Sequence, residues 1–226
     1  MLEWVIWAVT IVLSGVGVGY YIRRYKKPDL LIGLYVLFLA AAQIVAAKII
    51  AVGPFIVPAS IFIYPFTLLL VDCIVEFFGR EEAHRAIVIC FVTQVVMVLL
   101  LWLSIITEPA VFWGLQPSWE TIFSVGIRIT AASWVAFLTC HLFDVYLFSR
   151  LRDWAYSRWK KARFPAMRAG IVDVPILALD SVIFITCAFY GLFDIAPLII
   201  GQIATKWITG VADSPIISLA KKIGYG

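Results

Sequence analysis

The sequence predicts an all-α membrane protein with seven transmembrane helices. Of its 226 residues, 63% are hydrophobic and only 14% are charged, and the mean hydropathy is +1.01. Soluble domains carry about 25% charged residues, so most of this chain must face lipid. Apolar runs of about 20 residues, the length that crosses a bilayer as a helix, recur from one end of the chain to the other.

Seven such runs define the expected helices. By residue number they are 4–22, 30–52, 59–78, 86–106, 121–148, 169–191 and 195–220. The first run follows Glu3 and precedes RRYKK, which reverses the charge order of a signal peptide, so we expect it to remain as a membrane helix. The four cysteines lie in apolar runs without paired spacing. We expect them to be core residues, and we expect no metal site and no cofactor.

Lysine and arginine are concentrated in four regions between or after these helices. Segments 23–27, 79–85, 149–168 and 221–222 contain 15 of the 18 basic residues. The positive-inside rule places these regions in the cytoplasm. We therefore expect a multi-pass protein of the cell (plasma or inner) membrane, with its N-terminus outside and its C-terminus in the cytoplasm. The same rule accounts for the net charge of +4, so we expect no nucleic-acid partner.

The third run carries two acids inside a hydrophobic helix. Asp72 and Glu76 are four residues apart, so they share one face of a helix that is otherwise apolar all round. A charge in lipid costs several kcal/mol unless it faces a partner or a protein-lined cavity. We expect these two carboxylates to accept hydrogen bonds from a ligand rather than to hold the helices together.

Further charged residues lie deep in the later helices. Asp173 and Asp180 are seven residues apart and share a helix face, as do Lys206 and Asp213. We expect Lys206 to pair with Asp180, or with Asp213 on its own helix. Asp173 lies near the cytoplasmic end and is expected to be solvated. Buried ion pairs stabilise poorly because desolvation offsets their attraction, so the set is better explained by a wet cavity that holds a ligand.

Simpler structural roles remain open for several of these residues. Lys48 and Arg128 can place their charged ends at the outer membrane interface, and His141 can form a satisfied core pair with Asp144, one turn away. Ion pairing that only stabilises the bundle is the alternative for the deeper groups.

The motifs of soluble enzymes are missing from the sequence. It contains no HExxH, GxSxG or P-loop motif. A transporter, or the substrate-capture component of a vitamin transporter, is the simplest interpretation. A membrane-embedded enzyme that uses the buried acids for proton transfer is the alternative.

Four segments carry a resemblance to a known family. They are YPFTLLLVDCIVEFFGREEAHRAI, RITAASWVAFLTCHLFDVYLFSRLR, LDSVIFITCAFYG and ATKWITGVADSPIISLAKK. Together they resemble the queuosine precursor transporter family, also called the vitamin uptake transporter family, over about residues 34–222. The resemblance implies uptake of a 7-deazapurine precursor of queuosine or archaeosine, of the queuine, preQ0 or preQ1 type. It also implies a six-helix core, residues 29–226, like the substrate-binding components of energy-coupling-factor transporters, with residues 1–28 as an extra N-terminal helix and basic turn.

The resemblance also singles out particular polar positions. Three residues depart from the family's usual pattern, namely Gln43, His141 and Leu177. The candidate substrate-binding residues are Gln43, Lys48, Asp72, Glu76, Arg128, Ser133, His141, Asp144, Asp180, Lys206 and Asp213.

The chemistry of such a ligand suits these residue types. A 7-deazaguanine presents a ring N–H and an exocyclic amine side by side, which one carboxylate can accept together, and its flat ring requires aromatic or apolar faces. The expected partners are therefore a nucleobase-like small molecule and the lipid bilayer. An external energising module is a further candidate partner, and proton coupling, sodium coupling and facilitated diffusion are equally open.

Overall fold

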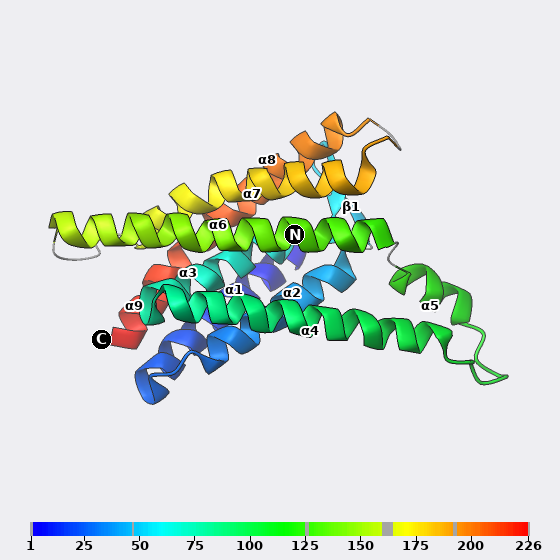
Figure 1. Ribbon diagram of the computed structural model, residues 1–226, viewed down its shortest axis with the longest axis horizontal. Coiled ribbons are helices and arrows are strands. Elements are labelled where there is room, and N and C mark those ends of the chain that lie inside the picture. The colour runs from blue at the N-terminus through cyan, green and yellow to red at the C-terminus, as the bar shows by residue number, and fades with distance from the viewer. Residues whose placement is uncertain (1, 47, 125–126, 160–164, 192–193, 226) are drawn as a thin grey trace.

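The computed structural model describes residues 2–46, 48–124, 127–159, 165–191 and 194–225, which are mostly helical (Figure 1). The helices are α1 (Leu2–Tyr25), α2 (Asp29–Val45), α3 (Tyr64–Phe78), α4 (Arg80–Ile106), α5 (Gln116–Phe123), α6 (Ile127–Trp159), α7 (Pro165–Phe189), α8 (Ala196–Asp213) and α9 (Pro215–Tyr225). A hairpin, β1 (Ile49–Val52) and β2 (Phe55–Pro58), and the 3-10 helix η1 (Ala59–Phe62) connect α2 to α3. This confirms the mostly helical class.

Five of the described helical stretches are long and apolar enough to cross a membrane. They are Trp4–Tyr25, Ala59–Phe78, Arg80–Ile106, Thr130–Trp154 and Ile171–Phe189. The structure therefore supports a multi-pass membrane protein, while the count of seven spans stays a prediction. The exposed side of α4 is a stripe of apolar residues, as expected for a lipid-facing surface. The stripe consists of Val88, Val92, Val96, Leu99 and Leu103.

Helix α3 lies at the centre of the bundle. Every residue from Pro65 to Glu76 is buried, because α3 packs against helices on several sides, including α2, α4, α6, α7 and α8. A helix that is apolar all round suits such a position. Gly79 then joins α3 directly to α4 with a φ of 94°, a backbone conformation that residues with a Cβ rarely adopt.

The second helix is shorter than residues 30–52, the range that the sequence predicts. Helix α2 ends at Val45, and residues 49–58 form an antiparallel hairpin in which Ile49 pairs with Pro58 and Val52 with Phe55. The tight turn at Gly53 and Pro54 reverses the chain and lets residues 49–52 pair with residues 55–58. Gly53 adopts a φ of 58°, and proline cannot donate the hydrogen bond that a continuing helix needs.

Three other expected boundaries are also wrong. The run 195–220 is broken into α8 and α9 at Pro215, which lacks the N–H for an unbroken helix. Helix α6 continues to Trp159, so much of the expected loop 149–168 is helical, although residues 160–164 lie outside the described chain. Segment 107–120, which the prediction leaves as a connection between two helices, contains the start of helix α5, and α5 is separate from α6.

Helix α1 packs along α9. A Cβ added at Gly19 would lie 2.7 Å from Cβ of Ile223 and 2.9 Å from the carbonyl oxygen of Ala220, so the two helices approach closely. Gly15, one turn earlier, faces Ile216 in the same way. Small residues four apart are the usual means by which membrane helices achieve such contact.

Candidate functional site

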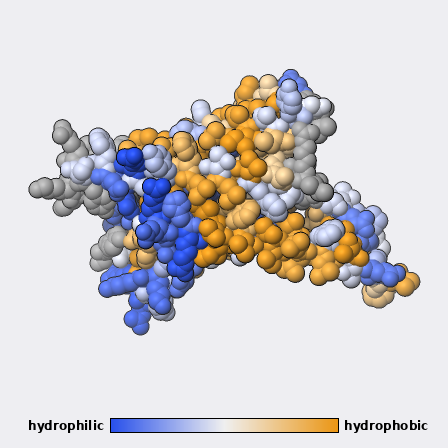
Figure 2. Space-filling model, in the orientation of Figure 1, coloured by the Kyte–Doolittle hydropathy of each residue, from blue (hydrophilic) through white to orange (hydrophobic). Residues whose placement is uncertain are grey.

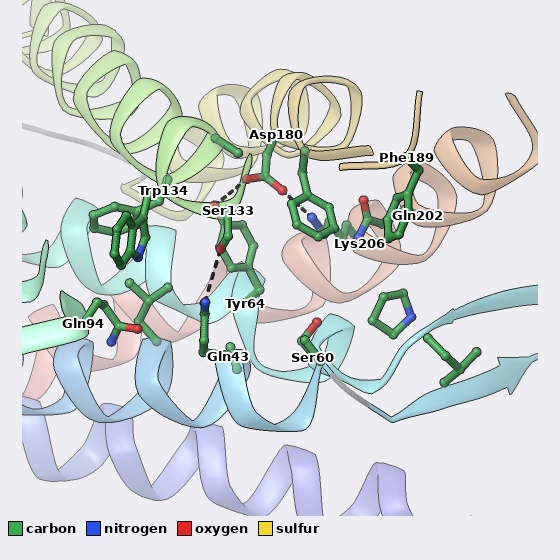
Figure 3. A pocket seen from close by; sticks show the side chains of 18 of the residues that line it. Gln43, Ser60, Tyr64, Gln94, Ser133, Trp134, Asp180, Phe189, Gln202 and Lys206 are labelled. Atoms are coloured by element: carbon green, nitrogen blue, oxygen red, sulfur yellow. Dashed lines mark hydrogen bonds and ion pairs between the residues drawn. The ribbon is translucent and has the colours of Figure 1, made fainter. Parts of the chain in front are cut away.

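The hairpin and α5 lie at one end of the bundle (Figure 1). Residues of both line a cavity of about 360 Å³ (Figure 3). Its wall is formed by residues from α2, α3, α4, α6, α7 and α8, together with both strands of the hairpin and the segment around α5. Small-molecule sites in proteins have volumes of about 300–1,000 Å³. The cavity is therefore large enough to hold a small molecule.

A buried ion pair forms part of the cavity wall. Lys206 on α8 donates to Oδ2 of Asp180 on α7, and the Tyr64 hydroxyl donates to Oδ1 of the same carboxylate at 2.7 Å (Figure 3). The Lys206 ammonium also lies 4.6 Å from the centre of the Tyr64 ring, within the range of a cation–π contact. The pairing of Lys206 with Asp180 is the first of the two pairings that the sequence predicts. Both oxygens of Asp180 are thus already occupied.

Three glutamine side chains contribute polar groups to the cavity wall. The Ser133 hydroxyl donates to Oε1 of Gln43 at 3.2 Å. Gln94 and Gln202 are each 3% exposed, and neither amide atom of Gln94 nor Oε1 of Gln202 has a hydrogen-bond partner in the described chain. Leaving a buried polar atom without a partner costs about 1–3 kcal/mol. A bound ligand or water that supplied those hydrogen bonds would remove this cost.

Aromatic rings supply the apolar part of the wall. They belong to Tyr64, Trp134, Phe137, Phe184 and Phe189. The indole N–H of Trp134 has no hydrogen-bond acceptor in the described chain, so this residue combines a flat apolar face with a free donor. The arrangement suits a flat, polar-edged heterocycle, because aromatic faces stack on its ring and the amides reach its edge.

The cavity contains four of the predicted binding residues, Gln43, Ser133, Asp180 and Lys206. Lys48 is exposed in the turn before β1 and does not line the cavity. The side chain of Arg128, near the start of α6, lies outside the described part of the chain.

His141 lies beside the cavity rather than in its wall. Its ring is fully buried, Nδ1 lies 2.8 Å from the Tyr35 hydroxyl, and its centre is 5.9 Å from that of Tyr64. It therefore supports the tyrosine that touches Asp180, and the expected pair with Asp144 is not among the described hydrogen bonds of its ring.

The predicted pair Asp72 and Glu76 is divided between two other environments. Glu76 forms an ion pair with Lys221 of α9. Asp72 faces Asp144 and Asp173, whose carboxylate oxygens lie within 4.8 Å of one another and of Asp72. The expectation that Asp173 is solvated is wrong, because it is 1% exposed. Asp213 is also buried, and none of these acids lines the described cavity.

Sequence reasoning missed several wall residues. Gln202 lies one helical turn before Lys206, so the same-face spacing that links the charged residues would have found it. Gln94 is a lone amide in an apolar run, which is the same signal that drew attention to Asp72. Tyr64 gives no such signal, since a tyrosine at the start of a membrane helix is usually an interface residue.

The fold and the cavity together describe a multi-pass membrane protein with a cavity of a size that suits a small molecule. Residues 58–220 match the family model described as "Putative vitamin uptake transporter", so the chain belongs to that family. This confirms the resemblance that the four sequence segments indicate. The description of this family is that of a transporter.

Two curated relatives carry a more specific description. A "Probable queuosine precursor transporter" of Bacillus subtilis is 26% identical over 155 residues, which cover 67% of this chain and 66% of the relative. A protein of the same description from Haemophilus influenzae is 30% identical over 133 residues, covering 58% of this chain and 51% of the relative. The chain thus spans about two thirds and about half of their lengths. No solved structure matches it.

Proposed function

We propose that this protein takes up a 7-deazapurine precursor of queuosine or archaeosine through the cavity between α2, α6, α7 and α8. The observation that carries the proposal is the combination of unpartnered buried amides, on Gln94 and Gln202, with aromatic faces in one cavity. The descriptions of the two relatives point to the same class of substrate.

The edge of a 7-deazaguanine complements the amide groups. Its ring N–H and carbonyl stand side by side, and its exocyclic amine adds a second donor. A glutamine amide offers one acceptor and two donors, so Gln94 can pair with the N–H and the carbonyl together, and Oε1 of Gln202 can accept from the amine. Asp72 and Glu76, the acceptors expected from the sequence, do not line this cavity, so this proposal gives that role to the amides.

The charge of the cavity favours an uncharged ligand. Its described wall contains one acid and one base, Asp180 and Lys206, and they neutralise each other. A 7-aminomethyl group, which is cationic, would lose its hydration without gaining a free carboxylate. We therefore propose that a 7-cyano-7-deazaguanine (preQ0) binds more tightly than its 7-aminomethyl counterpart (preQ1).

The distribution of basic residues orients the cavity. The most hydrophilic residues gather at the end of the molecule where α1 and α9 end and α3 turns into α4, apolar residues cover the middle, and a smaller hydrophilic group lies at the other end (Figure 2). The positive-inside rule places that end in the cytoplasm, so the cavity lies in the outer half of the membrane. On this basis the N-terminus is outside, the C-terminus is cytoplasmic, and α2 and the α8–α9 pair complete seven spans.

Uptake into proteoliposomes tests the proposal. Vesicles with the purified protein should accumulate labelled preQ0 unchanged, above the level of protein-free vesicles, and unlabelled preQ0 should compete better than preQ1. Imposed proton and sodium gradients, applied separately, identify the driving ion. Binding of an unrelated vitamin in place of any deazapurine, or failure of unlabelled preQ0 to compete, would overturn the assignment of substrate.

A further inference from the structure

A cluster of three carboxylates lies apart from the cavity. Asp72 on α3, Asp144 on α6 and Asp173 on α7 each contribute one oxygen to a group within 4.8 Å. Their side chains are 0%, 0% and 1% exposed. Three different helices therefore converge to place three acids in the interior of a membrane protein.

The described chain provides no counter-charge for this cluster. Three basic residues that are not fully exposed are engaged elsewhere: Lys206 with Asp180, Lys221 with Glu76, and Arg152 with the carbonyl oxygen of Val75 and with Asp153. No basic or hydroxyl side chain in the described chain donates a hydrogen bond to Asp72 or Asp144, and the group within hydrogen-bonding range of Asp72 is another acid, Asp173. A bundle held together by ion pairs would show the opposite arrangement.

A fourth helix contributes a further unpartnered acid. Asp213, at the end of α8, is 1% exposed, and neither of its carboxylate oxygens has a hydrogen-bond partner in the described chain. It lies close enough to Asp173 for electrostatic repulsion between the two. Asp213 does not belong to the three-oxygen group, but its carboxylate beside Asp173 adds to the negative charge that a cation would neutralise.

The geometry and the ligand atoms restrict what that positive charge is. Oxygens that bind one Ca²⁺ ion at about 2.3–2.6 Å lie at most roughly 5.2 Å apart, so three oxygens within 4.8 Å of one another are close enough to share such an ion. All of the available ligands are carboxylate oxygens, without nitrogen or sulfur. Such a set favours hard cations over zinc or copper.

We propose that Asp72, Asp144 and Asp173 form a binding site for a hard metal cation, Na⁺, Mg²⁺ or Ca²⁺, with Asp213 as an additional acid beside it. The bound ion neutralises carboxylates that would otherwise repel one another in a low-dielectric interior.

The site is connected to the cavity through two helices. Asp173 lies seven residues before Asp180 on α7, and Asp213 lies seven residues after Lys206 on α8, so each pair is separated by about 10 Å along a helix. Each of these two helices thus carries one charged residue at the cavity and one at the acid cluster. If the proposed transport function holds, a cation bound here is positioned to bias the two helices that hold the Asp180–Lys206 pair.

Thermal unfolding with metal ions alone tests the site, without any substrate. The full-length protein in detergent is stripped with EDTA and held at one pH and one ionic strength with choline chloride. Addition of NaCl, MgCl₂ or CaCl₂ should raise the unfolding midpoint by several degrees, and the rise should saturate, because an ion that binds only the folded state stabilises it by mass action. The ion that acts at the lowest concentration distinguishes Na⁺ from the divalent ions.

Two variants connect the response to the cluster. Asp144→Asn should lose the response to the metal while its metal-free midpoint stays the same or rises, since one repelling charge is gone. Glu81→Gln removes an exposed acid from the first turn of α4 and should respond as the unmodified protein does. If Asp144→Asn does not fold, equilibrium dialysis of the unmodified protein with the active ion should still give one ion per chain.

Three results would overturn the proposal. One is the lack of any midpoint shift and of any bound ion with all three salts. Another is a metal response of folded Asp144→Asn equal to that of the unmodified protein. The third is an unfolding midpoint that shifts with pH to the same extent with and without each of the three salts, which would show that the carboxylates share protons instead of binding a metal.

Discussion

Lys206 is buried between the carboxylate of Asp180 and the ring of Tyr64. A lysine in this position is tolerated only because the carboxylate neutralises it, since an unpaired ammonium in a membrane interior would lose its hydration without compensation. The same reasoning applies to the amides of Gln94 and Gln202, which are uncharged and can remain buried at a smaller cost. Individual side chains in the cavity are therefore constrained by their neighbours to different degrees.

Removal of one partner of the ion pair should be more harmful than removal of both. Lys206→Met leaves Asp180 as an uncompensated buried charge and should lower the free energy of unfolding by about 3–5 kcal/mol. Lys206→Met combined with Asp180→Leu should recover much of this loss. Thermal or denaturant unfolding of the two single variants and the double variant, compared as a double-mutant cycle, measures the coupling. Additive losses would show that the two residues do not interact.

Replacement of Gln94 should weaken ligand binding without destabilising the protein. Gln94→Leu removes a buried amide whose atoms have no partner in the described chain, so the ligand-free midpoint should stay the same or rise. The affinity for preQ0 should fall by about 1–3 kcal/mol, the typical value of lost ligand hydrogen bonds. Calorimetric titration measures the affinity. Thr93→Val, at the adjacent position outside the cavity wall, should bind as the unmodified protein does.

At the scale of elements, the close approach of α1 to α9 decides where the first helix lies. The helix has apolar residues on all sides, and many of them are exposed, so hydrophobicity alone gives it no preferred partner in lipid. The glycines at positions 15 and 19 provide a surface on which α9 approaches closely. Van der Waals contact in that groove then holds α1 against a helix that is distant from it in the sequence.

A large side chain in that groove should separate the two helices. Gly19→Leu must displace Ile223 and the backbone of α9, at a cost of about 1–3 kcal/mol typical of overpacking. A disulfide or crosslink engineered between α1 and α9 should therefore form in the unmodified protein and fail in the variant. Gly17→Leu is the matched control, because a Cβ at Gly17 meets nothing within 4 Å. Equal crosslinking of both variants would contradict the packing described here.

On the scale of the whole molecule, charge and apolar surface are separated along its length. The basic turns gather at the end opposite the hairpin and α5, and an apolar belt lies between the two ends (Figure 2). This separation matches the layers of a bilayer, in which charged segments remain in water and the apolar belt contacts the hydrocarbon.

Labelling from the two sides of the membrane checks the orientation. In a background in which exposed Cys187 is replaced by serine, a cysteine at Val111 should react with an impermeant maleimide from outside intact cells. A cysteine at Ser157 should react only after the membrane is opened, because its segment is rich in arginine and lysine. Reaction of Ser157→Cys in intact cells would reverse the orientation and the depth assigned to the cavity.

By itself, the sequence determined the class of the protein and its family. Hydropathy, basic turns and four motifs are properties of local composition and order, and they do not depend on how the helices pack. The rule that a deep charge requires a partner also limited the partners of Lys206 to Asp180 or Asp213, and the structure shows that it is Asp180. Helix ends were harder to predict from hydropathy, because α2 ends at Val45 and α8 ends at Asp213 inside longer, mostly apolar runs.

Only the tertiary structure decided which polar residues share a site. Asp72 and Glu76 lie on one helix face, yet α6 and α7 bring acids to the first and α9 brings Lys221 to the second. Gln43, Gln94 and Gln202 are far apart in the chain and meet only because α2, α4 and α8 surround one cavity. Periodicity assigns a side chain to a face of its own helix. The neighbour that this face meets depends on the packing of all the helices together, which no local pattern contains.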